Sequence, residues 1–146
     1  MSSESGESGD ERNPYPGGLG SRREARERAF HLLYESEMKG GDSGSVLAAL
    51  QLEPDSFAIE ILEGVEANAE AIDELIAEHA RNWEIDRMPA LDRAILRLAT
   101  FELAFRPDVP TGAAISEAVI LAKRYSTDDS GKFVNGVLSA IADQVR

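Results

Sequence analysis

The sequence predicts an all-α protein, and three observations favour that class. Alanine, leucine, isoleucine and glutamate are abundant, a mixture typical of helices that pack through aliphatic side chains. Aromatic residues make up only 6% of the chain, less than a β-sandwich would need, and no strand-like alternation is present. Apolar residues instead recur three and four positions apart. We therefore expect a compact bundle of about seven helices with short connections.

Residues 1–20 are predicted to form a disordered, acidic tail. They consist mainly of serine, glycine, glutamate and proline, with almost no apolar side chain to bury. They also lack the apolar stretch of a signal peptide. The folded part is therefore predicted to span residues 21–146 as a single domain, which is long enough to bury an ordinary core.

The first predicted helix follows this tail directly. Ser21 to Glu24 fit a capping box, in which the serine hydroxyl accepts from a backbone N–H of the first turn and the glutamate reaches back to the cap. Apolar residues then recur at helical spacing up to Gly40-Gly41, which end the helix. A short helix is expected around Val46 to Leu50.

The remaining helices are marked by prolines and polar caps. Pro54 opens an amphipathic stretch that runs to His79, with a break or bend expected between Gly64 and Asn68. Further helices are predicted from Pro89 to Arg106 and after Pro110-Thr111. The last helix is expected to take its cap from one of the residues 128–130.

Catalytic, metal and cofactor sites are not expected in this sequence. The chain has no cysteine, which excludes disulfides and thiol chemistry and is typical of a cytoplasmic protein. His31 and His79 stand alone, without the paired spacing of a metal site, and no glycine-rich phosphate loop is present. No apolar run is long enough to predict a membrane span. We therefore expect a protein that acts by binding partners, without a cofactor.

The net charge of −12 is distributed unevenly. Residues 40–90 carry −10 of it, whereas residues 21–39 and 91–146 are close to neutral. The carboxylates of the acidic stretch fall at solvent-facing helix positions, which favours a solvated face over a converging acid–base pair. They include Glu60, Glu63, Glu66, Glu70 and Glu74.

A basic cluster at the start of the first helix is the first candidate binding site. Arg22, Arg23, Arg26 and Arg28 lie within seven residues, although cations at a helix N-terminus oppose the helix dipole. One turn of helix separates Arg22 from Arg26, so the two can grip successive phosphates or stack on unpaired bases. The alternative is that neighbouring glutamates neutralise them as ordinary surface pairs, and spacing alone does not decide between the two.

The start of the last helix is the second candidate. If Val134 and Leu138 face the core, Lys132 and Asn135 share a polar stripe with Phe133 beside them. A phenylalanine beside lysine and asparagine on an open face can stack on a base while its neighbours form hydrogen bonds. The alternative is that Phe133 is buried in the core.

Four segments in order resemble the NusB family of bacterial transcription antitermination factors. They are RREARERAFHLLYE at 22–35, NWEIDRMPALDRAILRLATFEL at 82–103, VPTGAAISEAVILAKRYS at 109–126 and DSGKFVNGVLSAI at 129–141. The resemblance implies a seven-helix fold of two packed helical bundles. It also implies a protein that binds the boxA element in the leader RNA of ribosomal RNA operons with ribosomal protein S10, within the antitermination complex of RNA polymerase.

The resemblance assigns roles to the candidate residues. The RNA-binding residues that it implies are Arg22, Arg23, Arg26, Asp129, Lys132, Phe133 and Asn135. For the contact with ribosomal protein S10 it points to the helix near Pro89, and there to Asp92 and Arg93. Some family members form homodimers, so a homodimer is a further expected partner. The sequence departs from the family pattern where Glu24 interrupts the basic run and where Ser116 replaces a common asparagine.

Two other functions fit parts of the pattern. NusB-like domains also occur as the RNA-binding part of ribosomal RNA cytosine methyltransferases, but those enzymes need a catalytic domain and a cysteine nucleophile, and this chain has no cysteine. A helical adaptor that binds only proteins would use its arginines merely as surface charge. Such an adaptor would bind boxA RNA no better than a scrambled RNA.

Overall fold

Helices account for all the regular secondary structure in the described part of the chain. The structure, a computed structural model, describes residues 19–50, 55–81 and 83–146. The α-helices there are α2 (Leu19–Lys39), α3 (Ser43–Ala48), α4 (Ser56–Ala67), α5 (Ala69–His79), α6 (Ala90–Phe105), α7 (Thr111–Tyr125) and α8 (Asp128–Val145), with a short 3-10 helix η1 (Ile85–Arg87) before α6. The predicted all-α class and the predicted seven helices are therefore confirmed within these ranges. Of the predicted tail, residues 1–18 lie outside the described residues.

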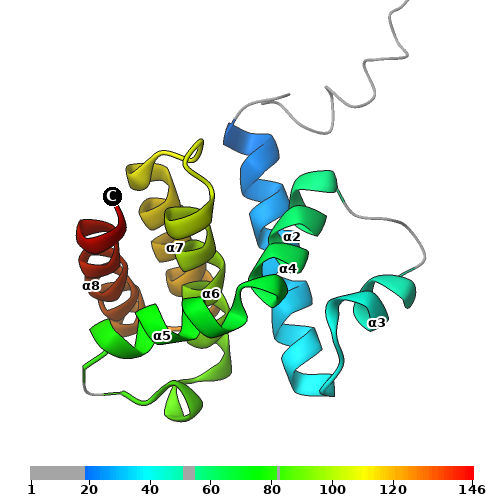
Figure 1. The fold of residues 1–146 in the computed structure, drawn as a ribbon, viewed down its shortest axis with the longest axis horizontal. Coiled ribbons are helices and arrows are strands. Elements are labelled where there is room, and N and C mark those ends of the chain that lie inside the picture. The colour runs from blue at the N-terminus through cyan, green and yellow to red at the C-terminus, as the bar shows by residue number, and fades with distance from the viewer. Residues whose placement is uncertain (1–18, 51–54, 82) are drawn as a thin grey trace, which may run out of the picture.

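The helices form two groups joined through α6. Helices α2, α3 and α4 pack together on one side, while α7 and α8 pack side by side on the other, with α5 running across their ends (Figure 1). Helix α6 contacts both groups, because it packs against α2 and α4 as well as α5, α7 and α8. The arrangement of two packed bundles that the family resemblance implied is confirmed.

The sequence of α6 explains its central place. Most of its side chains are buried, including Ile95, Leu96 and Leu98, so apolar residues cover more than one face of this helix. On α4, Gly64 allows a close approach to α6, since a Cβ atom at this position would lie 2.3 Å from Cζ of Phe101. The predicted break falls just after it: α4 ends at Ala67, and Asn68 separates α4 from α5.

Two of the predicted helix starts are wrong. Helix α2 begins at Leu19, so Ser21 lies inside the helix and not at its N-cap. Helix α8 takes its cap from Thr127, one residue before the predicted range, because the Thr127 hydroxyl accepts from the backbone N–H of Ser130 at 2.9 Å. At the start of α8 several neighbouring polar residues can serve as the cap, and local sequence does not rank them.

Aspartates set the starts of the two short helices of the first group. Asp42 caps α3 by accepting from the N–H of Ser45 at 2.8 Å, which places the helix start at Ser43, earlier than predicted. Asp55 caps α4 by accepting from the N–H of Phe57 at 2.7 Å. Pro54, the predicted start of α4, lies outside the described residues.

Candidate RNA-binding surface

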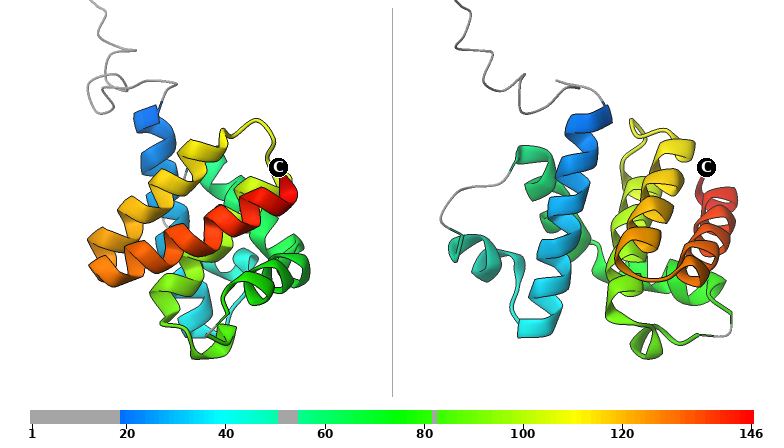
Figure 2. Two further views of the ribbon diagram at one scale, coloured as in Figure 1. Left: turned by 90° about the vertical axis from the view of Figure 1, so that its left-hand side faces the viewer. Right: turned by 180° about the vertical axis from the view of Figure 1, so that it is seen from behind.

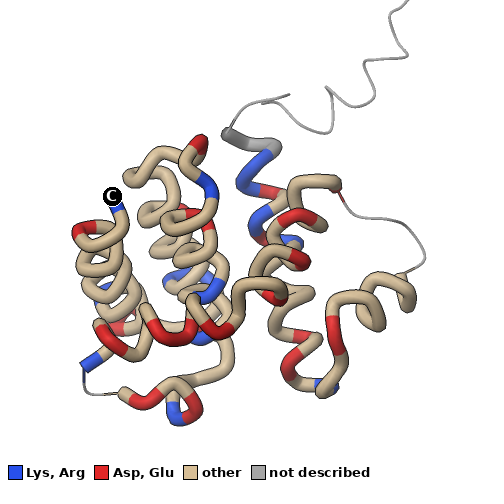
Figure 3. Tube along the Cα trace, viewed as in Figure 1, with Lys and Arg blue, Asp and Glu red and all other residues tan. Residues whose placement is uncertain are grey.

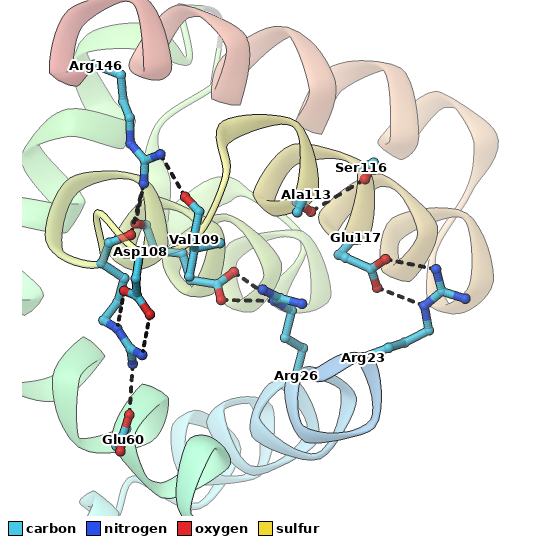
Figure 4. Close-up of polar contacts among 11 residues, drawn as sticks. Arg23, Arg26, Glu60, Asp108, Val109, Ala113, Ser116, Glu117 and Arg146 are labelled. Carbon is cyan, nitrogen blue, oxygen red and sulfur yellow. Dashed lines mark hydrogen bonds and ion pairs between the residues drawn. The ribbon is translucent and has the colours of Figure 1, made fainter. Parts of the chain in front are cut away.

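The arginines at the start of α2 point in three directions. A helix turns by about 100° per residue, so adjacent positions cannot all face one ligand. Arg23 extends towards α7, Arg26 extends towards α6 (Figure 4), and Arg22 lies over a ring of α4. The cluster that looks continuous in the sequence therefore presents only part of its charge to solvent.

Arg23 is exposed, as is Arg28, and Arg23 is the one held by an ion pair to α7. Its Nε and Nη2 atoms donate to the two carboxylate oxygens of Glu117 on α7, both at 2.9 Å. The Arg23 side chain is 53% exposed, whereas that of Glu117 is 8% exposed. A planar guanidinium anchored along one edge in this way is held in a fixed orientation at the surface, which suits recognition of a phosphate or a base.

Arg26 is enclosed within the protein. Its Nε atom lies 3.0 and 2.9 Å from the two carboxylate oxygens of Glu102 on α6, and the two side chains are 4% and 0% exposed. Burial raises the pKa of Glu102, and the hydrogen bond from Arg26 opposes that rise. As folded, Arg26 presents no surface to RNA, so any part it has in RNA binding comes through its attachment of α2 to α6.

Arg22 occupies an intermediate position. Its guanidinium carbon lies 4.2 Å from the centre of the Phe57 ring, and the Arg26 guanidinium approaches the same ring at 5.5 Å. Phe57 is 8% exposed and belongs to α4. Arg22 and Arg26 are therefore neighbours, as their spacing predicts, but the half-buried Arg22 faces α4 and not α7, which Arg23 contacts.

The start of α8 presents an exposed polar face. Asp129, Lys132 and Asn135 are all exposed, while Val134 is buried in the core. Phe133 lies between these environments: it is partly buried, packs against the core, and its ring centre lies 6.3 Å from that of Trp83. Burial in the core and exposure to a ligand, the two alternatives for Phe133, are therefore each partly correct.

Helix α7 connects the two candidate sites. It lies beside α8 and carries the exposed Lys123 and Arg124 at its C-terminal end, next to the start of α8 (Figure 2). The Lys123 side chain lies along Gly131, where an added Cβ atom would come within 3.0 Å of the lysine Cγ. Arg124 reaches Glu27 of α2 at 3.2 Å and is 56% exposed. Exposed basic side chains of α2, α7 and α8 therefore lie where these helices contact one another, with Glu27 and Glu117 paired among them.

Sequence reasoning missed Lys123 and Arg124. Cations in the last turn of a helix have an ordinary explanation, because they offset the helix dipole, so nothing local singles them out. The contact with Glu27 involves residues 97 positions apart and is made only in the folded chain. Tyr125 also donates to Glu27, and this hydrogen bond, reinforced by Arg124, holds the pKa of Glu27 below its usual value.

The residues predicted to contact ribosomal protein S10 lie mainly inside the fold. Asp92 is 3% exposed and accepts from the Ser130 hydroxyl at 2.9 Å, which ties α6 to α8. The side chain of Arg93 is 12% exposed. It donates to Glu37 of α2 and to the carbonyl oxygens of residues 85 and 88, so it fixes the turn before α6. In this arrangement Asp92 stabilises the packing of α6 against α8, and Arg93 stabilises the packing of α6 against α2.

Acidic side chains dominate a different part of the molecule. Red segments gather along α4 and α5, whereas blue segments mark the start of α2 (Figure 3). The glutamates predicted to face solvent, Glu60, Glu63, Glu66, Glu70 and Glu74, are all exposed.

Among residues 19–50, 55–81 and 83–146, no group of three or more metal-ligating side chains is arranged to hold an ion. None of the described helices is long and apolar enough to cross a membrane.

Together, the fold and this surface define a class: a small all-α binding protein whose basic side chains come from three helices. Comparison with known proteins narrows the class to a family. The model of the NusB family matches residues 23–143, so the chain belongs to the NusB family.

Individual relatives agree with this assignment. The chain is 48% identical over 130 residues to transcription antitermination protein NusB of Saccharopolyspora erythraea, covering 85% of this chain and 88% of the relative. It is 41% identical to the protein of that name from Myxococcus xanthus, covering 85% of this chain and 96% of the relative.

Solved structures show the same fold. NusB of T. maritima superimposes with a TM-score of 0.75 at 38% identity, covering 84% of this chain and 91% of that one. A crystal structure of antitermination factors NusB and NusE in complex with dsRNA contains a chain with a TM-score of 0.76 at 31% identity, covering 87% of this chain and 99% of that one.

Proposed function

We propose that this protein is a transcription antitermination factor that binds boxA leader RNA of ribosomal RNA operons together with ribosomal protein S10. The observation that carries the proposal is the set of exposed cations Arg23, Lys123, Arg124 and Lys132, which the contacts of Arg23 and Arg124 between α2 and α7 and of Lys123 with Gly131 of α8 bring to neighbouring positions on three helices. Phosphate binding needs exposed Lys and Arg side chains, and these four are exposed on a chain whose net charge is −12. Relatives named as antitermination proteins and a relative solved with NusE and RNA support the same function.

The RNA-binding residues in this proposal have distinct tasks. Arg23, Lys132 and the α7 pair Lys123 and Arg124 hold the backbone through phosphate contacts. The residues that contact bases are Asp129, Phe133 and Asn135, whereas Arg22 lies over the Phe57 ring of α4 and would reach RNA only if the RNA also passed along that side of α2. Arg26 acts as a positioning residue, since its ion pair with Glu102 fixes the helix from which Arg23 extends.

Ribosomal protein S10 would bind elsewhere on the molecule in this proposal. Arg93 supports the predicted contact region from beneath, whereas Asp92 lies under the start of α8, beside the RNA-binding residues. The exposed glutamates of α4 and α5 offer an acidic surface to a basic partner. Electrostatic complementarity of this kind raises the association rate and disfavours wrong partners. The bound pair would then join the antitermination complex of RNA polymerase. A homodimer that covered α2 would compete with RNA.

We further propose that the protein acts in the cytoplasm and without catalysis. The absence of cysteine from the sequence supports both statements, because it removes disulfides and thiol nucleophiles together. Both relatives reported above are named antitermination proteins, which favours antitermination over a fragment of a methyltransferase. The alternative that stays open to experiment is a helical adaptor that binds only proteins.

The test is a titration of the protein against fluorescent boxA RNA and a scrambled RNA at one stated salt concentration, with and without ribosomal protein S10. We expect selective binding to boxA that S10 strengthens and that Arg23→Ala and Lys132→Ala weaken. Lys39→Ala is the matched control, because Lys39 is an exposed cation at the opposite end of α2. Equal and weak binding to both RNAs, unaffected by the substitutions, would support the adaptor instead.

A further inference from the structure

Trp83 is an exposed aromatic residue beside the candidate RNA-binding surface. It is the single tryptophan of the chain and lies between α5 and η1. Large apolar side chains that are exposed in the described part of the chain include Met38, Trp83, Phe105 and Ile120. Trp83 is 47% exposed, and its ring lies next to that of Phe133, with planes inclined by 60°. Packing therefore leaves much of a large π-surface open to solvent at the edge of the candidate surface.

A pocket adjoins these two rings. It has a volume of about 240 Å³, and its lining includes Trp83, Phe133, Thr127 and Asp129. Pockets for drug-sized ligands usually measure about 300–1,000 Å³, so this one suits a single planar ring better than a whole ligand. Because Phe133 and Asp129 belong to the start of α8, the pocket is continuous with the surface proposed to bind RNA.

The polar groups of the pocket are mainly hydrogen-bond acceptors. Asp129 presents an exposed carboxylate. Deeper in the lining, one oxygen of Asp92 accepts from Ser130 at 2.9 Å, while the other is buried without a hydrogen-bond partner among the described residues. The accessible acceptor is the Asp129 carboxylate, with that of Asp92 behind it, so a ligand that brings an N–H group is preferred.

The same chemistry disfavours a phosphate group. Among the described residues, no lysine or arginine lines this pocket, and its two carboxylates would repel an anion. An occupant must therefore be flat, largely apolar on its faces and equipped with hydrogen-bond donors at its edge. Adenine, cytosine and guanine each carry an exocyclic amino group with two N–H donors, whereas the single edge donor of uracil, N3–H, is flanked by two carbonyl oxygens that the carboxylates of the pocket would repel.

We propose that this pocket receives one amino-bearing base of single-stranded RNA, stacked on Trp83. The inference rests on the proposed RNA-binding function and specifies how the surface selects a base. Lys132, next to Phe133 on the exposed face of α8, holds the adjoining phosphate. Base selectivity at this position comes from the acceptors around the pocket, and affinity comes from stacking and from the basic side chains outside it.

The fluorescence of Trp83 tests the proposal, because no other tryptophan contributes to the signal. Unlabelled boxA RNA and homopolymeric A, C and U oligonucleotides of equal length would be titrated while tryptophan emission is recorded. Binding would be measured separately by anisotropy of labelled RNA. We expect boxA, A and C to quench the emission in step with binding, and U to quench it weakly.

Two substitutions complete the design. Trp83→Leu should weaken binding of the A oligonucleotide by about fivefold or more, the loss that removal of one aromatic–base stack produces. Phe105→Leu is the matched control, because Phe105 is another partly exposed aromatic residue but does not line this pocket, and it should leave affinity unchanged. Circular dichroism would establish that both variants are folded.

The outcomes separate the two proposals. RNA that binds by anisotropy without changing tryptophan emission would overturn the pocket and leave the RNA-binding function intact. Quenching by U equal to that by A and C would overturn the selection of amino-bearing bases. No binding of boxA RNA by either measurement, in the presence of ribosomal protein S10, would overturn the proposed function itself.

Discussion

Replacing Arg26 by alanine should strongly destabilise the protein. The substitution leaves Glu102 fully buried without the guanidinium that lies 3.0 and 2.9 Å from its two oxygens. Removing one partner of a buried ion pair costs about 3–5 kcal/mol. A domain of this size is stable by about 5–15 kcal/mol, so Arg26→Ala should remove a large fraction of the free energy of unfolding.

The pH dependence of this loss has a definite sign. Burial raises the pKa of Glu102, and the substitution removes the hydrogen bond that opposes the rise. An acid whose pKa is higher in the folded state contributes stability below its unfolded pKa, and that contribution is lost as pH rises through the folded pKa. Arg26→Ala should therefore be closest to the wild type in acid, and its deficit should grow towards neutral pH.

Urea unfolding followed by circular dichroism at several pH values would measure both effects. A second variant, Arg26→Met with Glu102→Leu, replaces the pair by apolar side chains and should recover most of the stability, because neither charge is then left unpaired. It should also bind RNA as the wild type does, since Arg26 is enclosed. A loss below about 1 kcal/mol in the single variant, or equal instability of both variants, would refute the reasoning. Loss of RNA affinity in the stable double variant would show that RNA binding needs the Arg26–Glu102 pair itself and not merely a well-packed interior.

Three further predictions concern other features of the fold and surface. Gly64→Ala should lower the free energy of unfolding in urea by about 1–3 kcal/mol, because the new methyl group would overlap the ring of Phe101 on α6. Gly112→Ala, where the space is open, should not destabilise the protein, and equal effects of the two substitutions would contradict the packing argument. Lys123→Ala should lower the slope of log affinity against log salt by about 0.7 for single-stranded RNA, and an unchanged slope, like that expected of the control Lys39→Ala, would exclude a phosphate contact. Thr127→Ala should cost about 1 kcal/mol through loss of the α8 cap, and Thr127→Ser should restore it; a silent alanine variant would place the cap elsewhere.

The sequence by itself determined the fold class and most helix positions. Helical periodicity, glycines and prolines act over a few residues, so they locate the helices, including the break near Asn68, without knowledge of the partners. Four segments also sufficed to indicate the family, which residues 23–143 confirm. Helix starts were less certain, since Ser21 and residues 128–130 are all plausible caps and the folded chain uses neither as predicted.

Only the tertiary structure decided which side chains reach the surface. Arg23 and Arg26 lie on one helix three residues apart, yet Arg23 meets Glu117 at a half-exposed site and Arg26 meets Glu102 in the interior. Those partners are 94 and 76 residues away, so no local pattern distinguishes the two arginines. Periodicity defines the faces of a helix, but the helices that pack against each face determine which charges are buried and which stay available to RNA.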